Sequence, residues 1–136
     1  MQLVFGHDAA VAAFAAERLA LTISPPYVAI GVADETGLKG AAVYNNWNRW
    51  QIEISFYGPG CLTRPVIRSF LLAYPFDDLG AGRVTARTRR SNKTMQRLFP
   101  RLGFEMEGVL KRFYGPTKAD DAFIYRLDRQ AAERWR

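Results

Sequence analysis

Hydrophobic and polar residues alternate with a period of two over Trp50–Tyr57, the cleanest such repeat in the chain. One side of this segment is apolar, and the other carries its only acid, Glu53. A period of two places successive side chains on opposite faces of a β-strand. The apolar runs Gln2–Phe5, Tyr27–Ala33 and Leu38–Tyr44 are also predicted to be strands. Short clusters of turn-forming residues follow the last two runs, so an antiparallel meander is expected.

Helical spacing replaces the period of two further along the chain. One helix is predicted after the N-cap Thr63, with Pro65 in its first turn, where a missing N–H is tolerated. Its apolar face consists of Val66, Ile67, Phe70, Leu71 and Tyr74. A second helix should begin after the N-cap Asn92 and end at Gly103. Its apolar face consists of Met95, Leu98, Phe99 and Leu102.

The remaining segments complete an alternation of strands and helices. An Ala-rich helix is expected over Ala9–Ala20, with Asp8 as its N-cap. Further strands are predicted at Arg83–Thr88, Phe104–Tyr114 and Ala122–Leu127. The tail, Asp128–Arg136, is expected to be either a short helix or frayed. Together these elements predict one α/β (α+β) domain over residues 1–136, with a mixed, mostly antiparallel sheet of six to seven strands and three to four flanking helices.

Positive charge is concentrated in the second half of the chain. The net charge is +6, yet residues 1–82 hold five basic and seven acidic side chains, whereas residues 83–136 hold fourteen and six. Residues 83–101 contain no acid and seven basic residues: Arg83, Arg87, Arg89, Arg90, Lys93, Arg97 and Arg101. Such a patch suits nucleic acid or a phosphate-rich cofactor. A plain solvated basic face is an equally good interpretation.

The residue inventory excludes several chemistries. His7 is the only histidine and Cys61 the only cysteine, so no zinc cluster and no intrachain disulfide can form. A nucleophile–histidine pair would have to use His7, which precedes the first helix. Neither phosphate-loop nor dinucleotide glycine motifs are present. No apolar run reaches the roughly 20 residues of a membrane span, and the N-terminus does not resemble a signal peptide. A single cysteine suits a reducing setting, so we expect a cytoplasmic protein.

The second half carries a spaced set of residues that points to a known family. Asn92 begins a helix that is followed by Leu102-Gly103-Phe104 and then by Glu107-Gly108; Ala73–Phe76 and Gly82–Ala86 lie upstream. Over about residues 50–127 the chain resembles the GNAT superfamily of acetyl-CoA-dependent N-acetyltransferases. It looks most like the branch that modifies ribosomal-protein N-termini and small amines. The resemblance implies transfer of an acetyl group from acetyl-CoA to a primary amine of a small molecule, a peptide or a protein N-terminus.

The resemblance also implies where acetyl-CoA binds, with no metal. In this family the cofactor enters a gap between the fourth and fifth strands, and its pyrophosphate lies against the start of the next helix. The matching positions here are Ser55, Phe56, Gly60, Cys61, Leu62, Thr63, Arg64, Asn92 and Arg97. The loop departs from the family pattern, because Leu62 stands where a glycine is usual and two prolines lack N–H donors. Asn92 has a second interpretation, as a helix cap alone.

Glu53 and Tyr114 are the implied catalytic residues. Many members of this family use a carboxylate on the fourth strand as the base, and Glu53 is the only acid there, although it could equally be a solvated strand residue. Many also use a tyrosine as an acid where this chain has Phe99; Tyr114, Tyr57 or water would replace it. Cys61 is interpreted as a small filler residue, since no activating base is evident. The acceptor is expected near Ser24–Tyr27 and the turn from Tyr114 to Asp121.

A second hypothesis belongs to another class. A GNAT-like domain without turnover could use its basic face as a binding module for nucleic acid or a protein partner, and the departures at Leu62 and Phe99 motivate it. Nucleic-acid binding would fall steeply with added salt, whereas specific CoA binding would survive it. A homodimer is compatible with the sequence, but no feature of the sequence demonstrates one.

Overall fold

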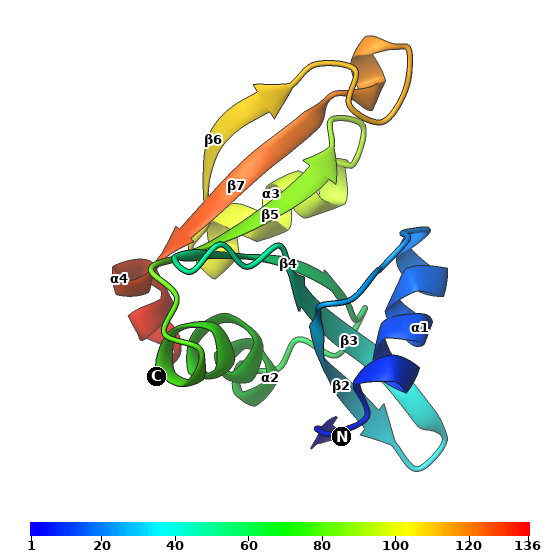
Figure 1. The fold of residues 1–136 in the computed structure, drawn as a ribbon, viewed down its shortest axis with the longest axis vertical. Coiled ribbons are helices and arrows are strands. Elements are labelled where there is room, and N and C mark those ends of the chain that lie inside the picture. Colours follow the sequence, from blue (N-terminus) through cyan, green and yellow to red (C-terminus); the bar gives the residue numbers. More distant parts are fainter.

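A computed structural model describes residues 1–136 as a seven-stranded sheet in the order β1-β2-β3-β4-β5-β7-β6 (Figure 1). The strands are β1 (Gln2–Val4), β2 (Val28–Asp34), β3 (Gly37–Asn45), β4 (Gln51–Tyr57), β5 (Arg83–Arg89), β6 (Glu105–Leu110) and β7 (Ala122–Asp128). Every neighbouring pair is antiparallel except β4 and β5, which are parallel. The predicted fold class, a mixed and mostly antiparallel sheet with helices, is therefore confirmed.

Helices cover the two faces of the sheet unequally. They are α1 (Asp8–Leu19), α2 (Arg64–Arg68), the π-helix η1 (Ser69–Asp78), α3 (Lys93–Leu102), the 3₁₀ turn η2 (Lys118–Asp120), α4 (Arg129–Ala132) and the 3₁₀ turn η3 (Glu133–Trp135). The helices α2, η1, α3 and α4 share the main core with β2–β5 and β7. On the other face, α1 forms a small Ala- and Val-rich core with β2 and β3. No helix is long and apolar enough to span a bilayer.

The structure confirms the predicted cap residues of α3 but not that of α1. Asn92 caps α3 as expected, because its Oδ1 accepts a hydrogen bond from Met95 N at 3.2 Å, and Gly103 ends the helix with φ +108°. The expected N-cap of α1, Asp8, is wrong. Asp8 is the first helical residue, and its carboxylate instead accepts a hydrogen bond from Ala29 N at 3.2 Å. That bond fastens the start of α1 to β2.

Trp50 does not belong to the buried side of β4, contrary to the expected alternation. Its side chain is 63% exposed, whereas Ile52 and Ile54 are buried. The side chain of Asn48 accepts hydrogen bonds from the backbone N–H groups of Trp50 and Gln51, so a polar turn precedes the strand. The indole occupies the space where a side chain at Gly82 would stand. Trp50 therefore covers the start of β5, outside the core.

The π-helix η1 follows α2 without a break and contains Pro75. Hydrogen bonds in a π-helix join residues five apart, as from Leu79 N to Tyr74 O. Pro75 has no N–H, so in this register the carbonyl of Phe70 lacks its helical donor. The buried Tyr44 hydroxyl supplies it, donating to Phe70 O at 2.6 Å. Sequence spacing predicted this helix and its buried face but not the π register.

The strand expected over Phe104–Tyr114 ends early, at Leu110. Arg112 adopts a positive φ of +56° there, and its N–H donates to the Asp121 carboxylate at 2.9 Å instead of continuing a ladder. A turn closed by Thr117 and Asp120 completes the connection to β7. The tail beyond Asp128 is helical, which confirms one of the two predicted states.

Candidate active site

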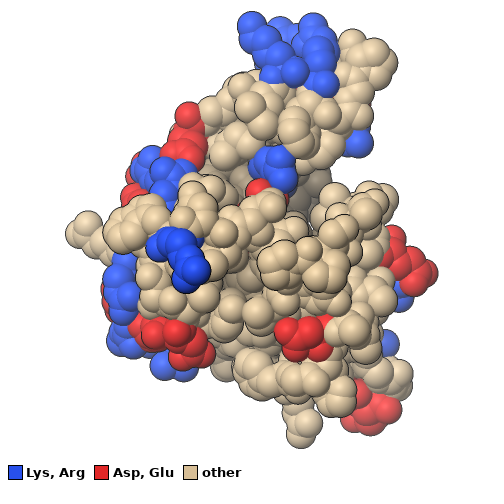
Figure 2. Space-filling model, viewed as in Figure 1, with Lys and Arg blue, Asp and Glu red and all other residues tan.

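The parallel strands β4 and β5 pair at only three positions, which end at Glu53 and Thr85. Beyond this branch point, β4 continues to Tyr57 paired with β3, and β5 continues to Arg89 paired with β7. Each strand therefore has one edge without a strand partner, and the two ribbons diverge (Figure 1). The surface is hollowed between the part that contains β5–β7 and the part that contains α1 and β3 (Figure 2). The gap expected between the fourth and fifth strands is present.

The loop after β4 presents unused backbone donors. The N–H groups of Cys61 and Thr63 bond within the loop, to Gly58 O and Cys61 O at 2.9 Å each. The N–H groups of Gly60 and Leu62 make no hydrogen bond, and Gly60 has a φ of +75°, which favours glycine. Free N–H groups at the start of a helical segment suit an anion. This donor set fits a pyrophosphate despite Leu62.

Cys61 anchors this loop. Its side chain is buried in the main core, and a Cβ built at either Gly58 or Gly40 would lie within 3.4 Å of the Cys61 Cβ. The close packing leaves room only for glycine at those two positions. The structure therefore gives Cys61 a packing role, in agreement with its interpretation as a filler residue.

Arg64 is directed away from the loop. Its Nη2 donates to Arg134 O at 2.7 Å, and its guanidinium lies 5.6 Å from the centre of the Trp135 ring. Thr63 precedes α2 in an extended conformation and makes no capping hydrogen bond, so its hydroxyl is free. Of these two predicted cofactor contacts, the Thr63 hydroxyl has no partner and could bind a ligand. The Arg64 guanidinium is instead bonded to the C-terminal tail.

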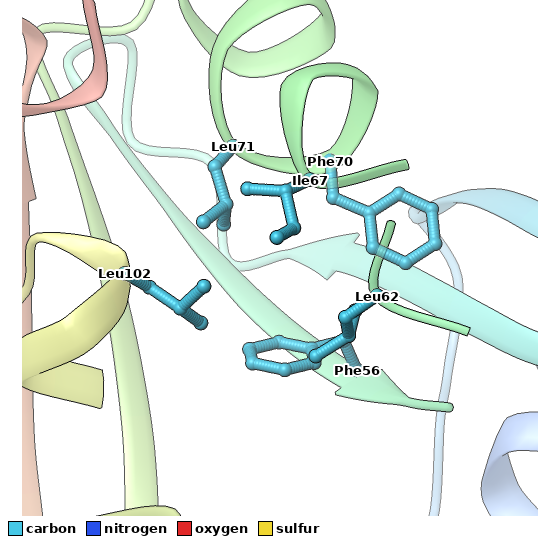
Figure 3. Close-up of a pocket in the computed structure, with 6 residues that line it drawn as sticks. All are labelled: Phe56, Leu62, Ile67, Phe70, Leu71 and Leu102. Carbon is cyan, nitrogen blue, oxygen red and sulfur yellow. The ribbon is translucent and has the colours of Figure 1, made fainter. Parts of the chain in front are cut away.

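A narrow apolar pocket, with essentially no room for a water molecule, lies between β4, the loop, helix α2–η1 and the end of α3 (Figure 3). Its lining residues are Phe56, Leu62, Ile67, Phe70, Leu71 and Leu102. Phe99 packs edge-on against Phe56, with ring centres 6.0 Å apart, and also contacts the rings of Phe104 and Tyr125. Phe99 therefore fills an apolar cluster at a position where the resembled family often has a hydroxyl.

Glu53 stands at the branch point on the face opposite α2 and α3. Its Oε2 accepts a hydrogen bond from Arg87 Nη2 at 2.8 Å, and its Oε1 accepts one from Asn46 Nδ2 at 3.3 Å. The side chain is 16% exposed, so it is held in place and only partly solvated. Sequence reasoning missed Arg87 and Asn46 as its partners. The pairing of Glu53 with Thr85 was the missing information, since it places Arg87 on the same face two residues later.

Tyr114 lies beside this ion pair. Burial raises the pKa of the Tyr114 phenol; the positive charge of Arg87 opposes that rise, and the negative charge of Glu53 adds to it. Arg89 lies over the ring, with its guanidinium carbon 4.7 Å from the ring centre. Tyr57 instead packs against Phe14 on α1, with ring centres 5.9 Å apart. Of the two tyrosines considered as acids, Tyr114 lies close enough to Glu53 for its charge to act on the phenol, whereas Tyr57 packs on α1.

The basic segment 83–101 is largely neutralised by ion pairs. Four of its seven cations have carboxylate partners: Arg83 with Glu107, Arg87 with Glu53, Arg89 with Asp120 and Arg90 with Asp121. The other three, Lys93, Arg97 and Arg101, follow one another at four-residue spacing on α3, where each is exposed. Arg97 therefore remains free for a phosphate, and the side-chain amide N–H groups of Asn92 remain free beside its cap. No group of three or more His, Cys, Asp or Glu side chains could hold a metal ion.

Known structures share this fold. A variant of the spermidine N-acetyltransferase SpeG from Vibrio cholerae superposes with a TM-score of 0.76 at 14% identity, and the match covers 97% of each chain. A chimera of that protein with hSSAT gives 0.74 at 15% identity, over 97% of this chain and 98% of the other. Mutant forms of the same Vibrio cholerae protein give 0.69 at 17%, over 82% and 72%. No protein-family model and no curated protein matches the sequence. The likeness confirms the fold that the resemblance to N-acetyltransferases implied.

Proposed function

We propose that this protein is an N-acetyltransferase that moves an acetyl group from acetyl-CoA to the primary amine of a small molecule, a peptide or a protein N-terminus. The observation that carries the proposal is the branch of β4 from β5 directly after Glu53. The branch leaves one edge of β4 free for an extended ligand. The Glu53 carboxylate, which Arg87 holds by a hydrogen bond, lies where that free edge begins.

The residues on one side of the branch suit the cofactor. Acetyl-CoA supplies an acyl thioester that an amine can attack. The free edge of β4 at Ser55 and Phe56 offers backbone groups to an extended chain. The unbonded N–H groups of Gly60 and Leu62, with the Thr63 hydroxyl, offer donors to a pyrophosphate. On α3, Arg97 and the amide of Asn92 would hold the remaining polar groups. Cys61 packs beneath the loop, and the Arg64 guanidinium would have to leave Arg134 O to reach a phosphate.

The residues on the other face suit proton transfer. An amine must lose a proton to react, and Glu53 is the carboxylate placed to accept it, directly or through water. Arg87 and Asn46 fix the orientation of that carboxylate. Because burial raises the pKa of Tyr114, its phenol stays protonated at neutral pH and can donate its proton to a departing group. The names of the neighbouring structures, which are spermidine N-acetyltransferases, support the proposed activity.

A turnover assay tests the proposal. Release of free thiol from acetyl-CoA is followed with a panel of primary amines, for the parent protein and for Glu53→Gln. We expect acceptor-dependent release that the substitution lowers by about 10²-fold or more, since a positioned base contributes about that factor. Glu35→Gln, in the exposed β2–β3 turn, is the matched control and should leave the rate unchanged. An unchanged rate in Glu53→Gln would contradict the role of Glu53, and no release with any amine would contradict the activity.

A further inference from the structure

Arginines surround the acceptor side of Glu53. Arg87 and Arg89 lie on β5, on the same face of the sheet as α1. On that face α1 packs over β2, β3 and β4 and leaves β5 uncovered. The connection between β6 and β7 adds Arg112, and Arg90 follows β5 directly. Basic side chains gather at the end of the molecule where the β6–β7 connection lies, at the top of the view (Figure 2). Six cations lie at or just after the C-terminal end of β5 and on the β6–β7 connection: Arg87, Arg89, Arg90, Lys111, Arg112 and Lys118.

The carboxylates of β4 and of the β6–β7 connection all have arginine partners. Glu53 accepts from Arg87 at 2.8 Å, and Asp120 accepts from Arg89 at 2.8 Å. Asp121 is buried and accepts from two arginines, Arg112 at 2.9 Å and Arg90 at 3.3 Å. The facing segment between α1 and β2, residues 21–27, contains no charged residue. A polyamine at Glu53 would therefore meet no unpaired carboxylate on β4 or on the β6–β7 connection, and it would have to lie beside like charges.

The same arginines retain donors for an anion. A guanidinium has five N–H donors, and Arg87 and Arg89 each spend only one terminal nitrogen on a carboxylate. Aromatic rings hold both groups, because Arg87 lies 4.8 Å from the centre of the Phe113 ring and Arg89 lies 4.7 Å from that of Tyr114. Arg87 is 28% exposed and Arg89 47%, so solvent reaches both. Such oriented guanidinium groups are well suited to bind a carboxylate.

We propose that the acceptor of this enzyme is an amine that carries a carboxylate a few bonds away, as an α-amino acid does, and that Arg89 binds this carboxylate while Glu53 faces the amine. The inference rests on the N-acetyltransferase activity proposed above. It sets this chain apart from the spermidine N-acetyltransferases that share its fold, since spermidine is a polycation without a carboxylate.

L-Lysine and cadaverine provide a matched pair of acceptors, because they differ only in the α-carboxylate. With acetyl-CoA, kcat/KM should be about tenfold or more higher for lysine, as expected for one charge-assisted hydrogen bond. The acetyl group should appear on the α-amine in the product. Spermidine should be no better than cadaverine. Raising the ionic strength should shrink the preference, because Arg89 is partly exposed.

Arg89→Gln should reduce the ratio of lysine to cadaverine toward one. Arg68→Gln is the control, since Arg68 is an exposed arginine on α2, on the opposite face of the sheet, and it should keep the ratio. Calorimetric binding of lysine and of cadaverine to the protein with CoA present should show the same preference without turnover.

The outcomes separate two failures. Turnover in which cadaverine or spermidine equals or exceeds lysine overturns this inference and leaves the N-acetyltransferase activity standing. A lysine preference that survives in Arg89→Gln also overturns it. Absence of both turnover and acetyl-CoA binding overturns the activity, and the inference with it.

Discussion

Glu53 and Tyr114 share the influence of Arg87. Arg87 bonds the Glu53 carboxylate, and the charges of Arg87 and Arg89 act on the Tyr114 phenol, which burial keeps protonated. In the proposed mechanism this carboxylate and this phenol would act as base and acid at the same pH. Arg87 would then position Glu53, and its charge would act on the Tyr114 phenol.

Tyr114→Phe tests the acid. Loss of the phenol should lower kcat by about 10- to 100-fold, in the lower range of general acid catalysis, with little change in KM for the amine. Because the pKa of Tyr114 is raised above its ordinary value of 10.0, the parent rate should fall only as the pH rises beyond 10, where the phenol loses its proton. The variant should lack that decline. Tyr57→Phe is the matched control, since Tyr57 packs on α1; a larger effect there would reassign the acid.

The π-helix η1 packs beneath the candidate site. Its residues Phe70 and Leu71 line the apolar pocket next to Phe56, and its register depends on Pro75 and on the Tyr44 hydroxyl. An α-helical register would change which side chains face β4. The Tyr44 hydrogen bond is therefore a link between the middle of the sheet and the shape of the pocket.

Tyr44→Phe should lower the free energy of unfolding by about 1–3 kcal/mol, because the buried Phe70 carbonyl would lose the hydroxyl that donates to it. Urea denaturation at neutral pH measures this, with Tyr27→Phe as a control that removes a hydroxyl without a hydrogen bond in the structure. Burial raises the pKa of Tyr44 well above 10.0, so the folded state holds this proton more tightly and stability should fall as the pH rises past 10. The variant should show a weaker alkaline fall. Equal stability of Tyr44→Phe and the parent would refute this role of the hydroxyl.

Much of the element order could be predicted from the sequence, because it follows local periodicity. Asn92 and Gly103 are caps of α3 as their residue types suggest, and Ile52 and Ile54 face the core. The features that could not be predicted depend on contacts between distant segments. Asp8 bonds to β2 instead of capping, and Glu53 is paired because β4 and β5 are parallel and in register. Such partners can be identified only when the pairing register of the strands is known, and the sequence alone does not give it.

At the scale of the whole molecule, charge that is concentrated in the sequence is paired in space. Acids at Glu53, Asp120 and Asp121 come from elsewhere in the chain and neutralise arginines of the segment 83–101. The cations that remain unpaired, Lys93, Arg97 and Arg101, form a row of only three residues on α3. The segment therefore presents few unpaired cations to a polyanion, which favours an enzyme over a module for nucleic acid.

The central claim is that the branch of β4 from β5 binds acetyl-CoA. Calorimetric titration of acetyl-CoA into the purified protein, at near-physiological salt, tests it most directly. We predict saturable binding with a Kd in the micromolar range, equivalent to about −8 kcal/mol at 1 µM. No binding up to millimolar acetyl-CoA would contradict the claim and would leave the unpaired cations of α3 and a binding role as the better account.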